Sequence, residues 1–530
     1  MKKTSRLFNE RLNGSLKNKI FYNIFILLFS VSMGVLSVYL IPININTVFD
    51  FEIFTTLAIT FIVSLLFSEK FLKKTFHYLK NNKSISILLL IITFVILRKL
   101  KFTKVDNVIT LIPSNMQFLF TDVTLIISGI ALFCVLTFVV FKLLEFYHGV
   151  YNTLDKWDKK AYIVMSILSF ILIVTVYNFN HNYFLQYDRV FSMDSGWVFN
   201  GMVPQLNYYD IRHPFISIFY FPIWAIIETC LNNIIGVTSL ATTIKAVILQ
   251  FINFQLLIIV GLYLKKICNN KNVFILYMLS FPTLIYLLFF EKYQLCVFML
   301  VSYVYLSCLN KDDKFFITSA AGVMLTSCFI GITEIIKDND LKKKISNITK
   351  ILIFALLFSV LVGRIHLIRY GLYESLDIQK GFANTALSFH QKIYSTFNMI
   401  QSTIVSVGTV NINGQYLWND LTNKLPLCGI FIFLISVIGA ISKRKELISK
   451  ISSIWIIFAF ILFTFLNWST HESPLFNMYF SWATIPMFVF GIDFVVEKLK
   501  LNSKFVYLFI YIIISFINFS TLFDIYKFLI

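Results

Sequence analysis

Charge is scarce in this chain of 530 residues, because Asp, Glu, Lys and Arg together make up only 14% of it. A soluble globular protein carries roughly 25%. Proline (9 residues) and glycine (18 residues) are also rare, while Phe, Ile, Asn and Lys are abundant. This composition is typical of an AT-rich bacterial genome. We find no low-complexity tract and no stretch polar enough for a soluble domain.

Cysteine motifs are missing as well. The seven cysteines are scattered, mostly in or beside apolar runs, and form neither a Cys-x-x-Cys pair nor a Cys/His cluster. This pattern predicts neither disulfides nor a structural zinc site.

Long apolar runs dominate what is present. Hydrophobic residues make up 58% of the chain, and about 20 such residues in a row cross a ~30 Å hydrocarbon core. The sequence therefore predicts an all-α polytopic membrane protein. The first run is too long for a signal peptide and no small-residue cleavage site follows it, so we expect a retained helix. Candidate spans lie at about 20–42, 51–68, 85–97, 123–144, 161–179, 215–231, 240–264, 273–290, 293–309, 315–336, 346–368, 425–442, 451–467, 475–496 and 502–527.

The net charge of +19 comes from basic residues in short loops between these runs. The positive-inside rule places such loops in the cytoplasm, so we interpret the charge as topology and predict no nucleic-acid partner. The helix at 161–179 then runs outward, and the two longest polar segments, 180–214 and 369–424, lie outside. The second is compatible with an amphipathic helix on the outer surface. Simple alternation fails around 215–270 and 315–345, where the number of crossings stays open.

A group of charges stands out in the stretch FSMDSGWVFNGMVPQLNYYDIRHPFISIFYFP (191–222). Asp194, Asp210, Arg212 and His213 lie there, at the entrance of an apolar run. Each has a plain alternative: Asp194 alone would be an ordinary loop acid, and His-Pro is an ordinary way to begin a helix. It is the grouping that indicates a site.

This stretch resembles the first external loop of the GT-C superfamily of membrane glycosyltransferases, in particular the glycosyltransferase family 39 type. Its members carry an acidic motif soon after an outward helix and then a His-Pro-Pro-Leu-like entry to the next helix. Asp194 matches the acid, and His213 with Pro214 matches the His-Pro. Two positions depart from the pattern, because Ser195 stands where a second acid is common and Phe215 where a second proline is common.

Two further stretches extend the resemblance over residues 160 to 490. Glu291 and Tyr293 lie between two apolar runs, similar to a Glu-x-Tyr in bacterial members, and His471 and Glu472 precede YFSWA in a late external loop. We therefore predict N-terminal membrane helices of unassigned role at 1–160 and a GT-C-like catalytic region at 161–530. Together they would form a bundle of about 12–15 transmembrane helices.

Topology groups these residues without reference to the resemblance. The helices that end near Glu291, Arg364 and His471 all leave basic loops and run outward, so we expect their ends to meet the loop that carries Asp194 and His213. Ionisable residues near membrane depth are functional hypotheses by default.

Other ionisable residues in apolar runs have plainer interpretations. We expect Lys245 to snorkel or to be paired, and Glu334 to accept from an internal polar group. Arg364, at the end of its helix, is also compatible with snorkelling.

The resemblance implies transfer of a sugar from a polyprenyl-phosphate carrier, with inversion, to an acceptor outside a bacterial cytoplasmic membrane. Asp194 would be the general base on the acceptor hydroxyl, and Arg364, or next Arg212, would stabilise the leaving phosphate. The acceptor stays open among cell-wall polysaccharide, teichoic acid, glycolipid and protein. The remaining candidates would bind sugar or acceptor or orient the base: Asp210, His213, Glu291, Tyr293, His471 and Glu472.

No cofactor is expected. The chain lacks a phosphate-cradling glycine loop and a soluble nucleotide-binding region with an Asp-x-Asp, which argues against a nucleotide donor. Some GT-C enzymes use a divalent cation, but Ser195 at the second acidic position favours an enzyme that requires no metal.

Two other classes of protein fit a basic chain of many helices. A polysaccharide polymerase or ligase also works outside with a large external loop, but 369–424 offers Arg369 and His390 rather than a dense arginine set. A lipid-linked-oligosaccharide flippase or other transporter places functional charges near the bilayer midplane, often on broken helices. The apolar runs here contain few acids.

Overall fold

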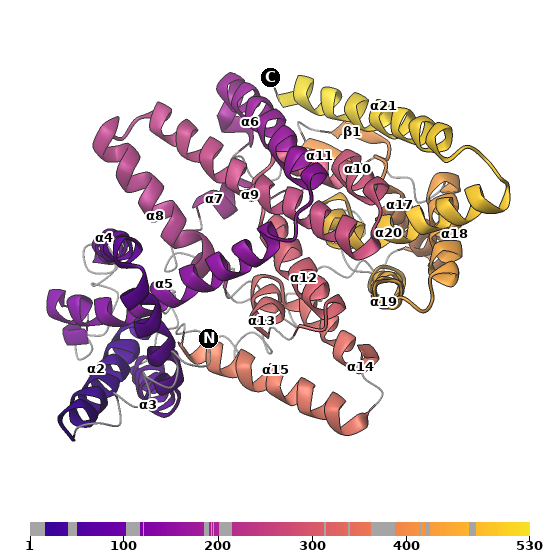
Figure 1. The fold of residues 1–530 in the computed structure, drawn as a ribbon. Coiled ribbons are helices and arrows are strands. Elements are labelled where there is room, and N and C mark those ends of the chain that lie inside the picture. The colour runs from indigo at the N-terminus through magenta and orange to yellow at the C-terminus, as the bar shows by residue number, and fades with distance from the viewer. Residues whose placement is uncertain are drawn as a thin grey trace.

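The computed structural model describes residues 16–40, 50–101, 117–119, 121–184, 190–191, 193, 195–200, 215–311, 314–337, 340–361, 387–412, 415–418, 424–465 and 473–529. Nearly all of them are helical (Figure 1). One antiparallel hairpin departs from the predicted all-α fold: β1 (Thr409–Ile412) pairs with β2 (Gln415–Trp418). This hairpin lies within the predicted external segment 369–424.

Four long helices form the N-terminal part of the fold: α2 (Leu16–Leu40), α3 (Asp50–Asn81), α4 (Lys83–Leu100) and α5 (Asp122–Tyr151). They share a buried apolar cluster, to which α8 also contributes Phe221 and Ala225. Figure 1 shows them together at the lower left, in indigo and purple. The N-terminal helices are therefore packed against the rest of the chain through α8.

The rest of the chain surrounds one larger buried cluster. In order, its elements are α6 (Lys156–Phe184), α7 (Ser195–Asn200), α8 (Ile216–Ile234), α9 (Ser239–Cys268), α10 (Lys271–Leu279), α11 (Phe281–Leu288), α12 (Lys292–Cys308), α13 (Lys314–Val323), the 3₁₀-helix η5 (Leu325–Ile332), α14 (Thr333–Lys337), α15 (Leu341–Leu361), α17 (Phe389–Ser402), α18 (Leu427–Ser442), α19 (Leu447–Phe460), the π-helix η6 (Ile461–Phe465), α20 (Ser473–Lys498) and α21 (Ser503–Leu529).

The protein is a multi-pass α-helical membrane protein, as predicted. Six helices among the described residues are long and apolar enough to cross a membrane, or up to eight if each of two bent helix pairs is one span. The predicted 12–15 crossings are not confirmed. One reason is length: α12 has 17 residues, α13 has 10 and α18 has 16, whereas a full crossing takes about 20.

Two predicted spans are not single helices. The span 273–290 divides into α10 and α11, which are bent by 50° at Ser280. Pro282 explains this break, because proline has no N–H to continue a helix but fits the first turn of a new one. The span 315–336 divides into α13, η5 and α14, with Met324 in an extended conformation after α13.

The outer face of α6 has the pattern of a lipid-facing surface. Ile163, Ile167 and Ile171 follow one another at four-residue spacing and are 57%, 55% and 54% exposed. Residues with this spacing lie on one face of a helix. Such an apolar stripe is stable in lipid.

Helices α18 and α20 approach each other closely at two glycines. A Cβ atom at Gly439 would lie 1.9 Å from the carbonyl oxygen of Met487, and one at Gly491 would lie 1.9 Å from that of Ile435. Glycine is therefore required at both positions, as is common where membrane helices touch. The contact fixes α20, whose first turns lie in the region of interest below.

A buried ion cluster joins α6 to the C-terminal end of α9. The side chain of Asp158 is fully buried, and Lys265 Nζ lies 2.6 Å from one of its oxygens and 2.7 Å from Asp155 Oδ2. The two aspartates also fix the start of α6, because each carboxylate accepts the other's backbone N–H, at 2.8 and 3.1 Å. The hydrogen bond from Lys265 lowers the pKa of Asp155 to about 2.

Replacing Asp158 by Asn should lower the free energy of unfolding by about 3 kcal/mol, because it leaves the buried Lys265 ammonium with only the half-exposed Asp155. Denaturant unfolding of the full-length protein in mixed detergent micelles measures this. Glu69→Gln is the control, because the Glu69–Lys73 pair is exposed and should contribute less than about 1 kcal/mol. Equal losses in the two variants would contradict a structural role for the buried cluster.

Candidate functional site

Two of the predicted site residues, Glu291 and Tyr293, lie in the described part of the chain. Seven lie outside the described residues: Asp194, Asp210, Arg212, His213, Arg364, His471 and Glu472. The convergence of all these side chains on one side of the membrane stays a prediction. The site can be built from Glu291 and Tyr293 and from the described neighbours of the other motifs.

Glu291 is fully buried at the start of α12. Its backbone has an extended conformation, and it forms a capping box with Gln294. In this arrangement the Glu291 carboxylate accepts from the backbone N–H of Gln294, while Gln294 Oε1 accepts from the backbone N–H of Glu291 at 3.0 Å. The first turn of α12 therefore holds the carboxylate in place.

Asn253 of α9 extends this arrangement. Its Nδ2 donates to the Glu291 carbonyl oxygen at 3.0 Å and to Gln294 Oε1 at 2.8 Å. Its Oδ1 accepts from the hydroxyl of Tyr220 in α8 at 2.6 Å. Four residues from three helices are thus tied together in a buried setting, where each polar group needs a partner.

Two glutamine amides satisfy the carbonyl groups at the end of α11. Gln250 Nε2 lies 2.7 Å from the Tyr286 oxygen, 2.9 Å from the Leu287 oxygen and 3.2 Å from the Phe289 oxygen. Gln294 Nε2 also reaches Tyr286 and Phe289, at 2.9 and 3.2 Å. The last carbonyls of a helix have no partner within it, and in a membrane water does not supply one. These amides are what permits a helix break here.

The three amides Gln250, Asn253 and Gln294 were not among the predicted site residues. A signal for two of them is present in the sequence, because Gln250 and Asn253 interrupt an apolar run at a spacing of three and therefore share one face of a helix. Their targets are 33 to 41 residues away along the chain, so the sequence does not indicate what they bind.

The helix rise places this network within the thickness of a bilayer. From Lys245 to Lys265, α9 rises about 30 Å at 1.5 Å per residue, which matches a hydrocarbon core. Asn253 lies between these lysines, about 18 Å along the helix from Lys265. Glu291, bonded to Asn253, lies at that level and is completely enclosed. It lies in a short turn between α11 and α12, as predicted, and its position toward the outer side of the membrane stays a prediction.

The described neighbours of three predicted motifs meet beside Glu291. Phe199, five residues after Asp194, packs edge-on against Phe290 with ring centres 6.5 Å apart. Tyr220, seven residues after His213, lies 5.4 Å from the same ring. Helices α7 and α8, which are close in the sequence, and the turn before α12, which is distant from both, therefore come together here.

Tyr293 provides the third meeting point. Its buried ring packs edge-on against Phe476 of α20, at 5.8 Å, and lies 6.2 Å from Tyr286. Phe476 comes four residues after Glu472. The start of α20 therefore packs against Tyr293, two residues after Glu291 in the sequence.

Lys245 is paired, which confirms one of the two interpretations. Its ammonium lies 3.7 Å from Glu228, which also receives Lys99 at 3.2 Å. The same ammonium lies 4.9 Å from the ring centre of Phe199 and 5.2 Å from that of Trp224, within range of a cation–π contact. Together with the Asp158–Lys265 cluster, this group marks the two ends of the apolar part of α9.

The prediction for Glu334 is also confirmed, because the buried carboxylate accepts from the Tyr303 hydroxyl at 2.5 Å.

Concerning metals, the described part of the chain contains no group of three or more His, Cys, Asp or Glu side chains able to hold an ion. The acids and histidine of the 191–222 stretch lie outside that part, so metal dependence stays a prediction.

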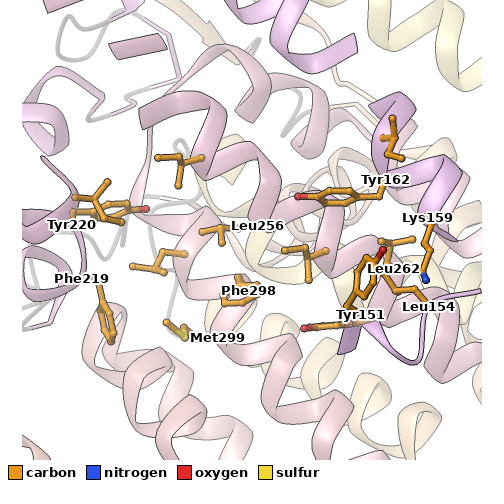
Figure 2. Close-up of a pocket in the computed structure, with 16 residues that line it drawn as sticks. Tyr151, Leu154, Lys159, Tyr162, Phe219, Tyr220, Leu256, Leu262, Phe298 and Met299 are labelled. Carbon is orange, nitrogen blue, oxygen red and sulfur yellow. The ribbon is translucent and has the colours of Figure 1, made fainter. Parts of the chain in front are cut away.

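An apolar cavity of about 570 Å³ adjoins the network. Tyr220 lines one end of it, and Tyr151 and Lys159 line the other (Figure 2). The site region is therefore a buried carboxylate in an amide network with a hydrophobic cavity beside it.

Comparisons with protein-family models, curated proteins and solved structures find no match for this chain. The resemblance to the GT-C superfamily thus depends on the sequence motifs alone.

Replacing Asn253 by Leu should lower the free energy of unfolding by at least about 1–3 kcal/mol, the range for one buried polar group left unpaired. The variant removes the hydrogen bonds to Tyr220, Glu291 and Gln294. Gln255→Leu on the same helix is the matched control, because its side chain makes one half-buried hydrogen bond, with Ser166. Denaturant unfolding in mixed micelles compares them; a larger loss in the control would show that the network is not a stabilising element.

Proposed function

We propose that this protein is a membrane glycosyltransferase that moves a sugar from a polyprenyl-phosphate carrier to an acceptor on the outer side of the membrane. The observation that carries the proposal is the meeting of Phe199, Tyr220 and Phe476 around Phe290 and Tyr293. Phe199 and Tyr220 follow Asp194 and His213 of the 191–222 stretch, and Phe476 follows Glu472 of the late loop. Neighbours of two motifs that are distant in the sequence thus lie around one buried carboxylate.

The position of Glu291 supports a role in binding. A carboxylate that is fully enclosed and inside the apolar thickness is costly, so such residues are usually functional. A sugar hydroxyl that donates to Glu291 would make a charge-assisted hydrogen bond of the stronger kind. We assign Glu291 and Tyr293 to binding of the sugar or acceptor.

The chemistry assigned to the other motifs follows from the donor. Its lipid tail stays in hydrocarbon and its charged phosphate near the outer membrane interface, so the sugar would reach inward from the phosphate to contact Glu291. Asp194 would take the proton of the acceptor hydroxyl as it attacks the anomeric carbon. The lipid phosphate would leave with the bonding electrons, and Arg364 or Arg212 would stabilise its charge. His213, Asp210, His471 and Glu472 would bind hydroxyl groups or orient the base.

A transporter of a lipid-linked glycan is the second candidate, and one observation favours it. Helices α10 and α11 form a broken pair, bent by 50°, directly before Glu291. Broken helices with a polar residue at membrane depth are typical of substrate sites in transporters. Transfer and transport differ in whether the glycosidic bond to the carrier phosphate is cleaved.

Replacing Asp194 by Asn should reduce sugar transfer by roughly 10²- to 10⁴-fold, the usual contribution of a general base. Glu291→Gln should reduce it by roughly 10- to 100-fold through the loss of a charged hydrogen-bond acceptor. Turnover of a radiolabelled polyprenyl-phosphate sugar in membranes that contain the full-length protein measures both.

Glu334→Gln is the matched control, because Glu334 is also a buried glutamate but bonds Tyr303 away from this region. It should retain wild-type transfer within about twofold, since glutamine still accepts that bond. Retained transfer in Asp194→Asn at normal protein levels would remove the general-base assignment. Movement of an intact lipid-linked sugar without cleavage, blocked by Glu291→Gln, would favour the transporter.

A further inference from the structure

The 570 Å³ cavity is a groove lined mainly by helices α6, α8, α9 and α12. Its floor is a stripe on α9 that runs from Ile252 through Leu256 and Ile259 to Tyr263, and its other walls come from α6, α8 and α12. Figure 2 shows Phe219 and Tyr220 at one end and Lys159, Tyr151 and Tyr162 at the other. The lining is almost entirely apolar, so the groove suits a hydrocarbon chain.

Lys159 is the charged residue of this lining. Its ammonium lies 4.2 Å from the ring centre of Tyr151. The nearby acids are engaged elsewhere: Asp155 and Asp158 pair with Lys265, and Asp158 also with Lys266. Among the described residues, no carboxylate forms an ion pair with Lys159. The groove therefore has a positive charge at one end, complementary to an anionic headgroup.

The length of the groove matches one leaflet of a bilayer. The stripe from Ile252 to Tyr263 on α9 rises about 16 Å, close to half of a ~30 Å hydrocarbon core. Its charged end lies beside the ion cluster of Asp158 and Lys265, which marks one end of the apolar part of α9. The groove thus begins at a membrane surface and ends near the bilayer middle.

We propose that the groove binds one acyl chain of an anionic glycerophospholipid, with the lipid phosphate at Lys159. The site belongs to the leaflet on the α5–α6 side, which the basic loops predict to be cytoplasmic. It is separate from the proposed sugar-transfer chemistry, which would use a carrier headgroup on the opposite side. The end of the acyl chain contacts Tyr220, which donates to Asn253 in the network that holds Glu291.

Native mass spectrometry of the full-length protein, released from nanodiscs of phosphatidylglycerol or phosphatidylcholine, tests this site. We expect one retained phosphatidylglycerol and weaker retention of phosphatidylcholine. Lys159→Gln should weaken phosphatidylglycerol binding about fivefold, the contribution of one lysine near a charged headgroup, and Lys159→Arg should restore it. Lys160→Gln is the matched control, because Lys160 is exposed on the next position of the helix and does not line the groove.

A second variant tests the groove independently of charge. Leu256→Trp should fill it and remove the retained lipid, whereas Ile512→Trp, at an exposed position of α21 that does not line the groove, should leave binding unchanged. Equal effects of Lys159→Gln and Lys160→Gln, or full retention in Leu256→Trp, would overturn the proposal. A third result would also overturn the proposal: polyprenyl phosphate displaces phosphatidylglycerol, and does so equally in the wild type and in Lys159→Gln. This result would assign the groove to the sugar carrier. None of these readouts depends on sugar transfer.

Discussion

A helix that breaks inside a membrane exposes carbonyl groups that water cannot reach, and this constraint shapes the centre of the protein. Between α11 and α12 it is met by Gln250 and Gln294, whose amides donate to the free carbonyls. Asn253 then ties the turn to Tyr220. Because these amides satisfy the free carbonyl groups, the chain can end α11 and start α12 within the protein interior. The carboxylate of Glu291 then caps α12, a position that a continuous helix would not offer.

The same break organises what surrounds it. The turn presents Phe290 and Tyr293 to α7, α8 and α20, while the glycine contact of α20 with α18 fixes α20 from the other side. Helix α9 carries one ion cluster near Lys245 and another at Lys265, about one hydrocarbon thickness apart. The carboxylate and the apolar groove lie between these clusters.

The sequence predicted local features better than long-range ones. Apolar runs predict most helices, and the resemblance together with topology indicates Glu291 between two of them. For Lys245, the cost of an isolated charge in such a run predicts snorkelling or pairing. Pro282 signals the break at Ser280, but the apolar run continues across it and by itself predicts a single span. The partners of Gln250 were not predictable, since tertiary packing and not local periodicity selects them. The convergence of Asp194 with Glu291 stays a prediction from topology.

The most direct measurement is an electron cryo-microscopy structure of the full-length protein in lipid nanodiscs with a non-hydrolysable polyprenyl-phosphate sugar. We predict the sugar within hydrogen-bond reach, about 3 Å, of Glu291 or Tyr293, with the Asp194 carboxylate on the face of the anomeric carbon opposite the phosphate. A donor bound away from Glu291, or Asp194 on the cytoplasmic side of the membrane, would contradict a single outward-facing site.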